Sequence, residues 1–527
     1  MIFRIVFLFA IFLVLSGCTQ VGPDFLKPEA TVAEGWLEPD EKPDDVSIKT
    51  DTSEYAEWWK SFNDPVLDAL ISMAYEENLP LQIAGIRILE SRAQLGIAVG
   101  SAYPQQQQIG ASVNRNLLSD NNVAPGAPTA FNTASAGLGV GWELDLWGQF
   151  ARGIEAADAE VLARIADYDD VLVSLTGSVA SAYTLIRTFE EQLSIARDNV
   201  KIQERSLEIT NVRFENGITT ELDVQQARTL LFNTQATIPA LEVGLQQSKN
   251  ALSTLLGLPP SNLDDLLQGP GVIPTAPAEV AIGIPAELLR RRPDIRTAEL
   301  QAASQSARIG IAEADLYPHF SLFGTVGLSA SDFAGRRIGD IAELDSVEAS
   351  FGPSVSWDIF NYGRIKNNVR VQDARLQQLL VNYQNVVLEA AREVEDALVG
   401  FIQAKRRVTF LSDSVDAAQR SVDLALLQYR DGIADYQRVL DTQESLLTTQ
   451  DQLTASKGEI AANLIAMYRA LGGGWEIRQG NEFVPAETKE QMKERTDWGE
   501  LLETTTPETL SDEVKSEEGK TYRSPDW

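Results

Sequence analysis

The sequence twice makes the same transition, from a short strand-like segment directly into a very long helical pattern. Residues 136–146 alternate between apolar side chains and glycine or acidic residues, the period of two that is typical of a β-strand with one face in apolar surroundings. After Gly148 apolar residues recur in steps of three and four as far as Phe214, which predicts a long coiled-coil-like helix. The same change of period follows Gly363. The chain must therefore fold into strands that continue as long helices.

The two transitions belong to an internal duplication. Equivalent residues in the strand, the helix and the turns are separated by a constant 215 positions. Such an offset indicates a repeated structural unit rather than chance similarity. The pairs are Trp142 and Trp357, Gly148 and Gly363, Tyr168 and Tyr383, Phe214 and Tyr429, Gly217 and Gly432, and Gly257 and Gly472.

The duplication sets the organisation of the chain. Each unit is expected to contain a helix, two strands and two long helices, and the first helix should run from Pro65 to about Ser101. The predicted segments are a signal peptide (1–17), an extended strap (18–60), the first repeat (61–258), a Pro/Gly-rich linker (259–284), the second repeat (285–475) and an acidic tail (476–527). The tail is expected to be disordered because it is rich in Glu, Thr, Ser and Lys.

The N-terminus has a basic residue, a short apolar run and small residues, the pattern of a secretory signal. Its ending, Leu15-Ser16-Gly17-Cys18, resembles the bacterial lipobox, which implies cleavage before Cys18 and acylation of its thiol. Cys18 is the only cysteine, so no disulfide can form within the chain. The alternative is an incidental cysteine beside a signal peptide.

Four strands of about ten residues suit a tilted crossing of a bilayer. No apolar run of about 18–20 residues follows the signal, so the strands are the only segments suited to the membrane. Four strands cannot close, and an open edge in lipid leaves amides unpaired. Three copies would give twelve strands, an even number within the range of known barrels. A helix of about 65 residues would extend about 95 Å beyond the barrel.

Several blocks together resemble the TolC-type outer-membrane efflux factors, in particular their lipoprotein branch, which serves resistance–nodulation–division (RND) pumps. They are the lipobox, Val-Gly-Pro-Asp-Phe at 21–25, Trp-Trp-x-x-Phe-x-Asp-Pro-x-Leu at 58–67, Arg-Arg-Pro-Asp-Ile-Arg at 291–296 and the duplicated strand-to-helix unit. The resemblance implies a membrane α+β fold, with four transmembrane strands per protomer completing a trimeric twelve-stranded barrel and a helical periplasmic tunnel. It also implies passive export of small molecules across the outer membrane, handed over by an inner-membrane pump through a periplasmic adaptor.

The resemblance also suggests residues of a periplasmic gate. Asp223, Tyr429 and Asp441 match residues that hold the family's tunnel closed or line its pore. We expect the Tyr429 hydroxyl to donate to a carboxylate, with Asp223 the favoured acceptor, and Arg438 to moderate a ring of three Asp441 carboxylates. Two positions depart from the family pattern, because Arg438 replaces a second pore aspartate and Ala434 replaces an arginine. The alternative is that these are solvated turn residues.

Other classes of function are disfavoured. The formal net charge of −32 argues against a nucleic-acid partner. His319 is the only histidine and is expected to be structural. The sequence contains no Walker loop, no Gly-x-Ser-x-Gly element and no Cys/His metal cluster, so we expect no enzymatic activity, no cofactor and no metal site.

Two other functions remain as alternatives. The first is the outer-membrane outlet of a type I protein secretion system. The second is a lipidated periplasmic adaptor or scaffold, which is disfavoured because adaptors have one helical hairpin and not two strand–helix repeats. Drugs, metals, lipids and proteins all remain open as cargo.

Overall fold

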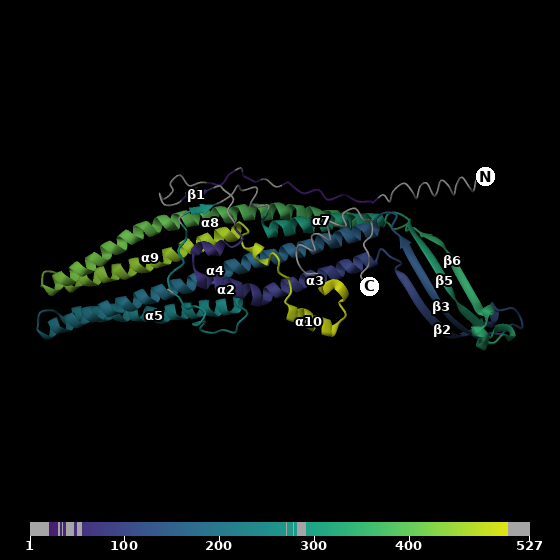
Figure 1. The fold of residues 1–527 in the computed structure, drawn as a ribbon, viewed down its shortest axis with the longest axis horizontal. Helices are drawn as coiled ribbons and strands as arrows, with labels where there is room; N and C mark the ends of the chain where they lie inside the picture. Colours follow the sequence, from purple (N-terminus) through teal and green to yellow (C-terminus); the bar gives the residue numbers. More distant parts are fainter. Residues whose placement is uncertain are drawn as a thin grey trace.

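The computed structural model describes residues 20–29, 32–33, 35–37, 47–49, 55–269, 271–277, 279–281 and 291–503. The protein is elongated, with helices over most of its length and a bent sheet at one end (Figure 1). Cys18 and residues 504–527 lie outside the described residues.

Two 67-residue helices, α4 (Gln149–Glu215) and α8 (Arg364–Arg430), run along the molecule. Each is about 100 Å long at 1.5 Å per residue, which confirms the predicted long helices. After each long helix the chain reverses direction and forms a 35-residue helix. This helix is α5 (Glu221–Leu255) after α4 and α9 (Tyr436–Ala470) after α8. All four boundaries of the first pair differ from those of the second by 215, so the duplication holds in three dimensions. None of the described helices is both long and apolar enough to cross a membrane.

The predicted helix from Pro65 to about Ser101 is divided in two, α2 (Pro65–Glu77) and α3 (Leu79–Gly100). Asn78 makes the break. Its side-chain oxygen accepts from the Leu81 amide at 3.0 Å and caps α3, while its amide nitrogen donates to the Leu255 carbonyl at 2.8 Å. The prediction of one helix was wrong because Asn78 with Pro80 forms an N-cap signal inside an otherwise helical pattern. In the second repeat α7 runs from Pro293 to Ala314.

The sheet contains β2 (Gln106–Leu117), β3 (Ala130–Leu144), β5 (His319–Ser331) and β6 (Val347–Ser356), all antiparallel in that order. Directly paired residues share a face. The register gathers the apolar positions of all four strands on one face: Ile109, Ala111, Val113, Ala134, Ala136, Leu138, Val140, Trp142, Leu322, Val326, Leu328, Val347, Ala349, Phe351 and Val355. The opposite face carries mainly Gly, Ser, Thr and Gln.

The apolar face of the sheet is open in the protomer. Ile109 and Phe351 are each 88% exposed. The outer edges of β2 and β6 have no strand beside them within the described sheet. A sheet with this surface requires an apolar medium and further strands.

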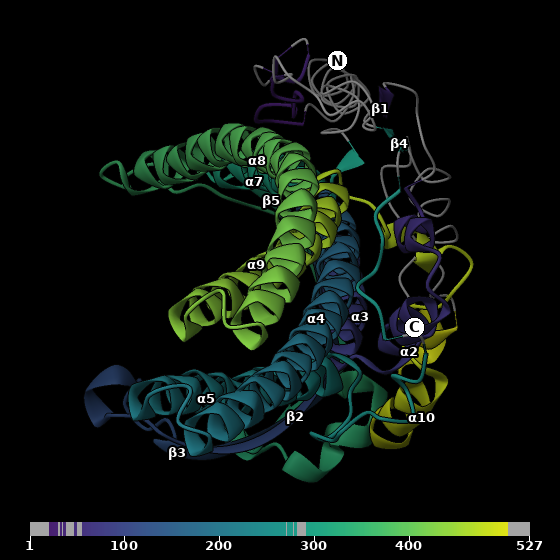
Figure 2. The ribbon, with the colours of Figure 1, turned by 90° about the vertical axis from the view of Figure 1, so that its left-hand side faces the viewer.

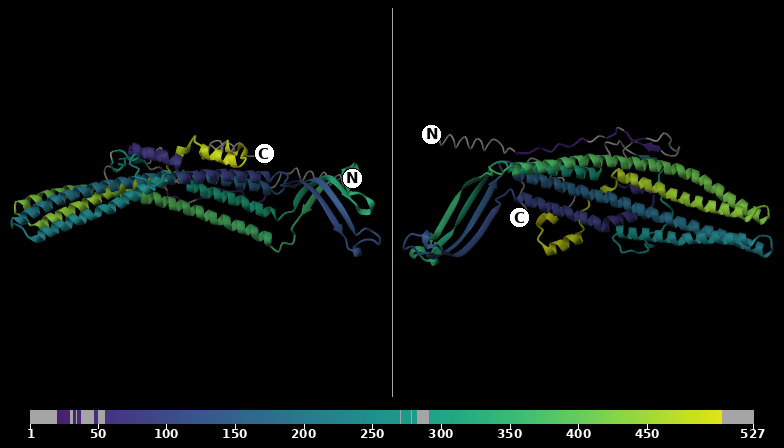
Figure 3. Two further views of the ribbon diagram at one scale, coloured as in Figure 1. Left: turned by 90° about the horizontal axis from the view of Figure 1, so that it is seen from below. Right: turned by 180° about the vertical axis from the view of Figure 1, so that it is seen from behind.

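The main core lies where α4 passes α2, α3 and α9. The rings of Trp58 and Trp59, in a short 3₁₀ helix (Trp58–Phe62), are almost fully buried there. In the view along the long axis α4, α5, α8 and α9 form a curved wall, with α2 and α10 (Ala486–Arg495) on its convex side (Figure 2). Views from below and from behind show these helices running along the length of the molecule, with α10 beside them (Figure 3).

A second, small sheet joins the strap to the linker. It consists of the short strands β1 (Ser47–Lys49) and β4 (Glu279–Ala281), which pair in parallel.

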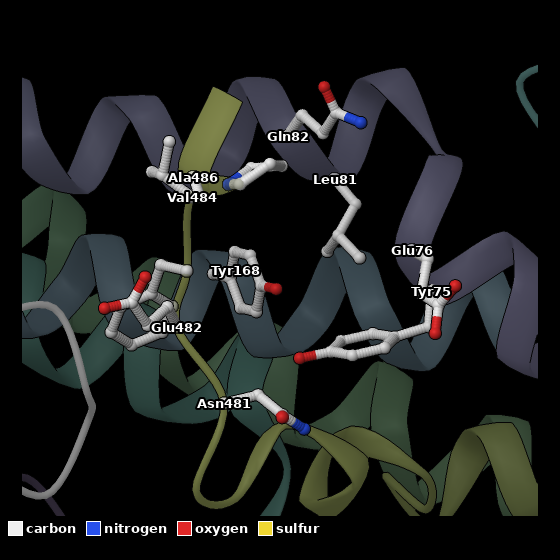
Figure 4. A pocket seen from close by; sticks show the side chains of 11 residues that line it. Tyr75, Glu76, Leu81, Gln82, Tyr168, Asn481, Glu482, Val484 and Ala486 are labelled. Carbon is white, nitrogen blue, oxygen red and sulfur yellow. The ribbon is translucent and has the colours of Figure 1, made fainter. Parts of the chain in front are cut away.

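The predicted disorder of residues 476–527 is wrong for residues 476–503. These residues form turns and the helix α10, and the segment Asn481–Ala486 crosses α3 and α4 (Figure 4). Arg478 is buried and pairs through two nitrogens with the buried Asp169 of α4. Phe483 is also buried and packs edge-on against Tyr168. The composition of the tail did not predict this ordered segment, because only a few of its side chains are buried against the helices and most of the residues between them are polar.

Candidate functional site

Both helix-to-helix turns lie at the end of the molecule farthest from the sheet (Figure 1). Gly217 and Gly432 stand after the ends of α4 and α8 with φ of 70° and 73°. Glycine suits this left-handed conformation, in which helices commonly end. The two turns, which are equivalent in the duplication, therefore lie at the same end of the molecule.

An aromatic cluster, which we call the tip cluster, joins the two turns. It contains Ala227 of α5, Ala425 and Tyr429 of α8, and Tyr436 and Val439 of α9. The Tyr429 and Tyr436 rings meet edge to face with centroids 5.2 Å apart. The Tyr436 hydroxyl lies 3.3 Å from the Ser206 hydroxyl of α4. Burial raises the pKa of Tyr436, so its hydroxyl stays protonated as a hydrogen-bond donor.

Arg213, in the last turn of α4, holds the C-terminus of α8. One guanidinium nitrogen donates to the carbonyls of Tyr429 at 2.7 Å and Arg430 at 3.0 Å. The guanidinium carbon also lies 4.6 Å from the centre of the Tyr429 ring. A cation is favourable at a helix C-terminus and over an aromatic face. Arg213 is not among the residues predicted from the sequence, although a basic side chain in the last helical turn, beside the Asn-Gly break, was a visible signal.

Asp223 lies in the first turn of α5 and is the third helical residue of a capping box in which Thr220 is the N-cap residue. Its carboxylate accepts from the Thr219 hydroxyl and, at 3.4 Å, from the Thr220 backbone amide. The buried Tyr429 hydroxyl makes no hydrogen bond to any described residue of the protomer. The expected Tyr429–Asp223 hydrogen bond is therefore wrong within one protomer, because the helix cap already occupies the carboxylate.

The structure places Asp441 and Arg438 on the exposed side of α9. Asp441 accepts from the Gln437 amide at 2.7 Å, one helical turn away. The Arg438 backbone amide donates to Asp435, which caps the helix. Within the described part of the protomer Arg438 and Asp441 form no ion pair, so an effect of Arg438 on the ring of Asp441 carboxylates in the trimer stays a prediction. Gln437 lies four residues before Asp441, a favourable spacing on a helix, and its side-chain amide is the donor that the Asp441 carboxylate accepts from.

His319 lies on the polar face of the sheet, at the start of β5. Its Nδ1 is 2.6 Å from a carboxylate oxygen of Glu143 on β3. The two side chains belong to neighbouring strands at the helix-side end of the sheet. The contact joins the two repeats, which agrees with a structural role for His319.

Comparison with known proteins identifies the assembly to which this geometry belongs. The model of the family "Outer membrane efflux protein" matches residues 70–258 and 284–473. The chain belongs to this family. Nodulation protein T of Rhizobium leguminosarum bv. trifolii is 30% identical, over 88% of this chain and 96% of the relative.

Other relatives give the same result. The solvent efflux pump outer membrane protein SrpC of Pseudomonas putida is 31% identical over 89% of this chain and 97% of its own length. The probable outer membrane lipoprotein SilC of Salmonella typhimurium is 30% identical over 88% and 97%. The solved structure of the outer-membrane channel OprN has a TM-score of 0.77 and 31% identity, and the match covers 86% of this chain and 99% of that one.

These matches confirm the predicted fold and location. Three copies of this efflux protein complete a twelve-stranded barrel that continues as a helical tunnel, and the barrel lies in the outer membrane. The relatives are channel proteins and not enzymes, which confirms the prediction on enzymatic activity. Membership of this family also excludes the adaptor or scaffold alternative.

A charge on the apolar face of the barrel wall should destabilise it. Leu138 lies near the middle of β3 on that face and pairs with Val326. We expect Leu138→Arg to reduce the free energy of unfolding by about 2–4 kcal/mol, the cost of an arginine near the bilayer midplane. Urea-induced unfolding of the protein in lipid vesicles measures this. Thr325→Arg, one register position away on the polar face, is the matched control and should have a much smaller effect. Equal losses in the two variants would show that the apolar face does not face lipid.

Proposed function

We propose that this protein is the outer-membrane duct of a tripartite efflux system, which exports small molecules received from an inner-membrane RND pump through a periplasmic adaptor. The observation that carries the proposal is that each second strand leads into a helix about 100 Å long through a short connection that ends in a left-handed glycine, residues 145–148 before α4 and 357–363 before α8. A barrel joined in this way to tubes of that length is built to connect the exterior with structures far below the membrane.

The side chains of the sheet support a passive duct. The face opposite the apolar one is lined mainly by glycine, serine and threonine, which leave space and offer hydroxyl groups. Relatives such as SrpC are described as parts of solvent efflux pumps, which favours small-molecule export over protein secretion.

The proposal predicts that cells without this protein become more sensitive to toxic small molecules. Deletion of the gene should increase sensitivity to some dyes, detergents, antibiotics or metals, and the wild-type gene should restore resistance. Growth-inhibition profiling over such a panel measures this, with membrane integrity checked by uptake of an unrelated dye. Unchanged sensitivity to every compound, together with loss of a secreted protein from the medium, would instead support the secretion outlet.

We also propose that Cys18 carries acyl chains. Gln20 is the first residue described at the N-terminus, and the Val21 amide donates to the Trp147 carbonyl at 3.0 Å, beside the strand-to-helix turn at Gly148. Arg152 of α4 then holds the strap through the Val21 and Gly22 carbonyls and Asp24. Cys18 precedes Val21 by three residues in the sequence, so acyl chains on it would be attached close along the chain to this anchored point.

Mass spectrometry of the purified mature protein tests the lipidation. We expect an N-terminal Cys18 carrying lipid, and a Cys18→Ser variant that retains its signal peptide. An unmodified Cys18, or an N-terminus elsewhere, would contradict the proposal. The barrel itself supplies insertion, so the acyl chains add anchoring.

We propose that the tip cluster keeps the periplasmic end of the tunnel closed. Arg213 couples the first-repeat turn to the second-repeat turn through the C-terminal carbonyls of α8. Asp441 and Arg438, exposed on α9, would set the charge at the entrance, and Asp223 would stabilise the start of α5. Tyr429 would act through its ring, which Arg213 covers.

This arrangement predicts that Arg213→Met opens the channel. Loss of the hydrogen bonds from a charged donor should weaken the closed state by about 1.5–3 kcal/mol per subunit. Single-channel conductance in planar bilayers should therefore exceed that of the wild type. Arg430→Met is the matched control because Arg430 lies in the same tip but is exposed and pairs only with its neighbour Asp431 among the described residues. Equal conductance in wild type and Arg213→Met would remove Arg213 from the gate.

A further inference from the structure

Figure 1 shows the end of the sheet that lies farthest from the long helices and forms the extracellular mouth of the barrel. An apolar pocket lies there, lined by residues just after β2, at the start of β3 and at and after the end of β5. We call it the mouth pocket; it has a volume of about 510 Å³ and is lined by Leu118, Phe131, Ser331, Phe333 and Arg336. This volume lies within the range of about 300–1,000 Å³ that is typical of small-molecule sites.

The strand register places this pocket on the polar face of the sheet. Thr133 pairs with Ser331, so Phe131 and Phe333 lie opposite each other one step further along the two strands. Their rings meet edge to face with centroids 5.0 Å apart. Leu118 follows β2 on the other side of Phe131. Three large apolar side chains thus interrupt a face that is otherwise mostly glycine, serine and threonine, with Phe323 the other large exception.

The position of Phe333 is fixed by its neighbour. The Asn132 side-chain amide donates to the Asp332 carboxylate at 2.6 Å, and the Asp332 backbone amide donates to the Asn132 carbonyl at 3.1 Å. The Asn132 backbone amide also donates to the Asp332 carboxylate, at 2.5 Å, and this bond together with the one from the Asn132 side chain lowers the pKa of Asp332, so the carboxylate stays ionised. These hydrogen bonds extend the strand pairing beyond β5 and hold Phe333 beside Phe131. Strand pairing therefore holds Phe131, Ser331 and Phe333 in place, and Arg336 follows the short 3₁₀ helix Phe333–Gly335 that begins directly after this pairing.

The charge at the pocket is positive although the chain has a net charge of −32. Arg336 lines the pocket and forms no ion pair within the described part of the chain. The nearest acid in sequence, Asp332, is directed toward Asn132. An unpaired guanidinium beside two aromatic rings matches a ligand with an aromatic body and an anionic group, because arginine pairs with carboxylates and sulfonates and the rings bury the apolar part.

We propose that the mouth pocket binds small aromatic organic anions as they leave the barrel. This inference rests on the proposed efflux function, since it makes the pocket the last contact of exported molecules with the protein. The site would bury the aromatic part of a ligand against the two phenylalanine rings and make one charge-assisted contact through Arg336. Binding of this kind is weak and reversible, which an exported molecule needs in order to leave the barrel.

Fluorescence titration with 8-anilinonaphthalene-1-sulfonate tests the proposal on wild-type trimers in lipid nanodiscs, with empty nanodiscs subtracted. The probe is an aromatic anion that brightens in apolar surroundings. We expect the Kd to rise at least about tenfold in the double variant Phe131→Ala/Phe333→Ala, and about tenfold in Arg336→Gln through loss of one charge-assisted contact. Because binding is measured without a pump, the result is independent of whether the protein takes part in tripartite efflux.

Two matched controls locate the site. Phe323→Ala removes another phenylalanine of the same face outside the pocket, and Arg337→Gln removes the adjacent arginine. Both should bind the probe as the wild type does. Each variant is first shown to form a heat-resistant trimer. Equal affinity in Arg336→Gln and Arg337→Gln, or equal loss in Phe323→Ala and the double variant, would overturn the proposal.

Discussion

A backbone amide in lipid must find its hydrogen-bonding partner within the protein, and this constraint determines the assembly. The protomer contributes four strands whose outer edges, on β2 and β6, are unpaired in its own sheet. Only neighbouring protomers can supply the missing partners. The same requirement fixes the register, because a slip of one residue would turn Leu138 and its apolar partners into the lumen and the glycines toward lipid. Trimerisation and the two-faced sheet therefore have one cause.

The junction between each second strand and its long helix fixes the direction of the tunnel helices relative to the barrel. Gly148 and Gly363 are the last residues of the short connections from β3 and β6, and their left-handed conformations start α4 and α8. At Gly148 a side chain would collide with Gln20 of the strap, so the strap and the turn are packed as one unit. Arg152, almost fully buried, binds the strap from the first turns of α4. A rigid junction of this kind fixes the direction of a helix whose far end lies about 100 Å away.

The sequence predicted the features that depend on periodicity and failed where single contacts decide. The strands, the 67-residue helices and the turns at Gly217 and Gly432 follow from repeated patterns that many residues support. The break at Asn78 depends on one capping side chain, and the folding of residues 476–503 depends on a few buried side chains, among them Arg478, which pairs with Asp169, and Phe483. At the tip, the resemblance to the family indicated which residues to examine, but it did not give the hydrogen-bonding partners of these residues. Asp223 proved to cap its own helix, and Arg213 proved to hold Tyr429.

The two repeats have equal geometry and different surroundings, and this difference explains the assembly of the tunnel. Along α4 an apolar or small side chain is buried at nearly every turn, because α5, α7, α3 and α9 all pack against it. On α8 Leu388, Val399 and Phe410 are exposed, although they recur every eleven residues and so lie close to one face of the helix. Apolar residues in such a row remain exposed only where another surface will cover them. We expect a neighbouring protomer to supply that surface in the trimer, so that the duplication provides one helix that holds the protomer together and an equivalent helix that joins it to the next.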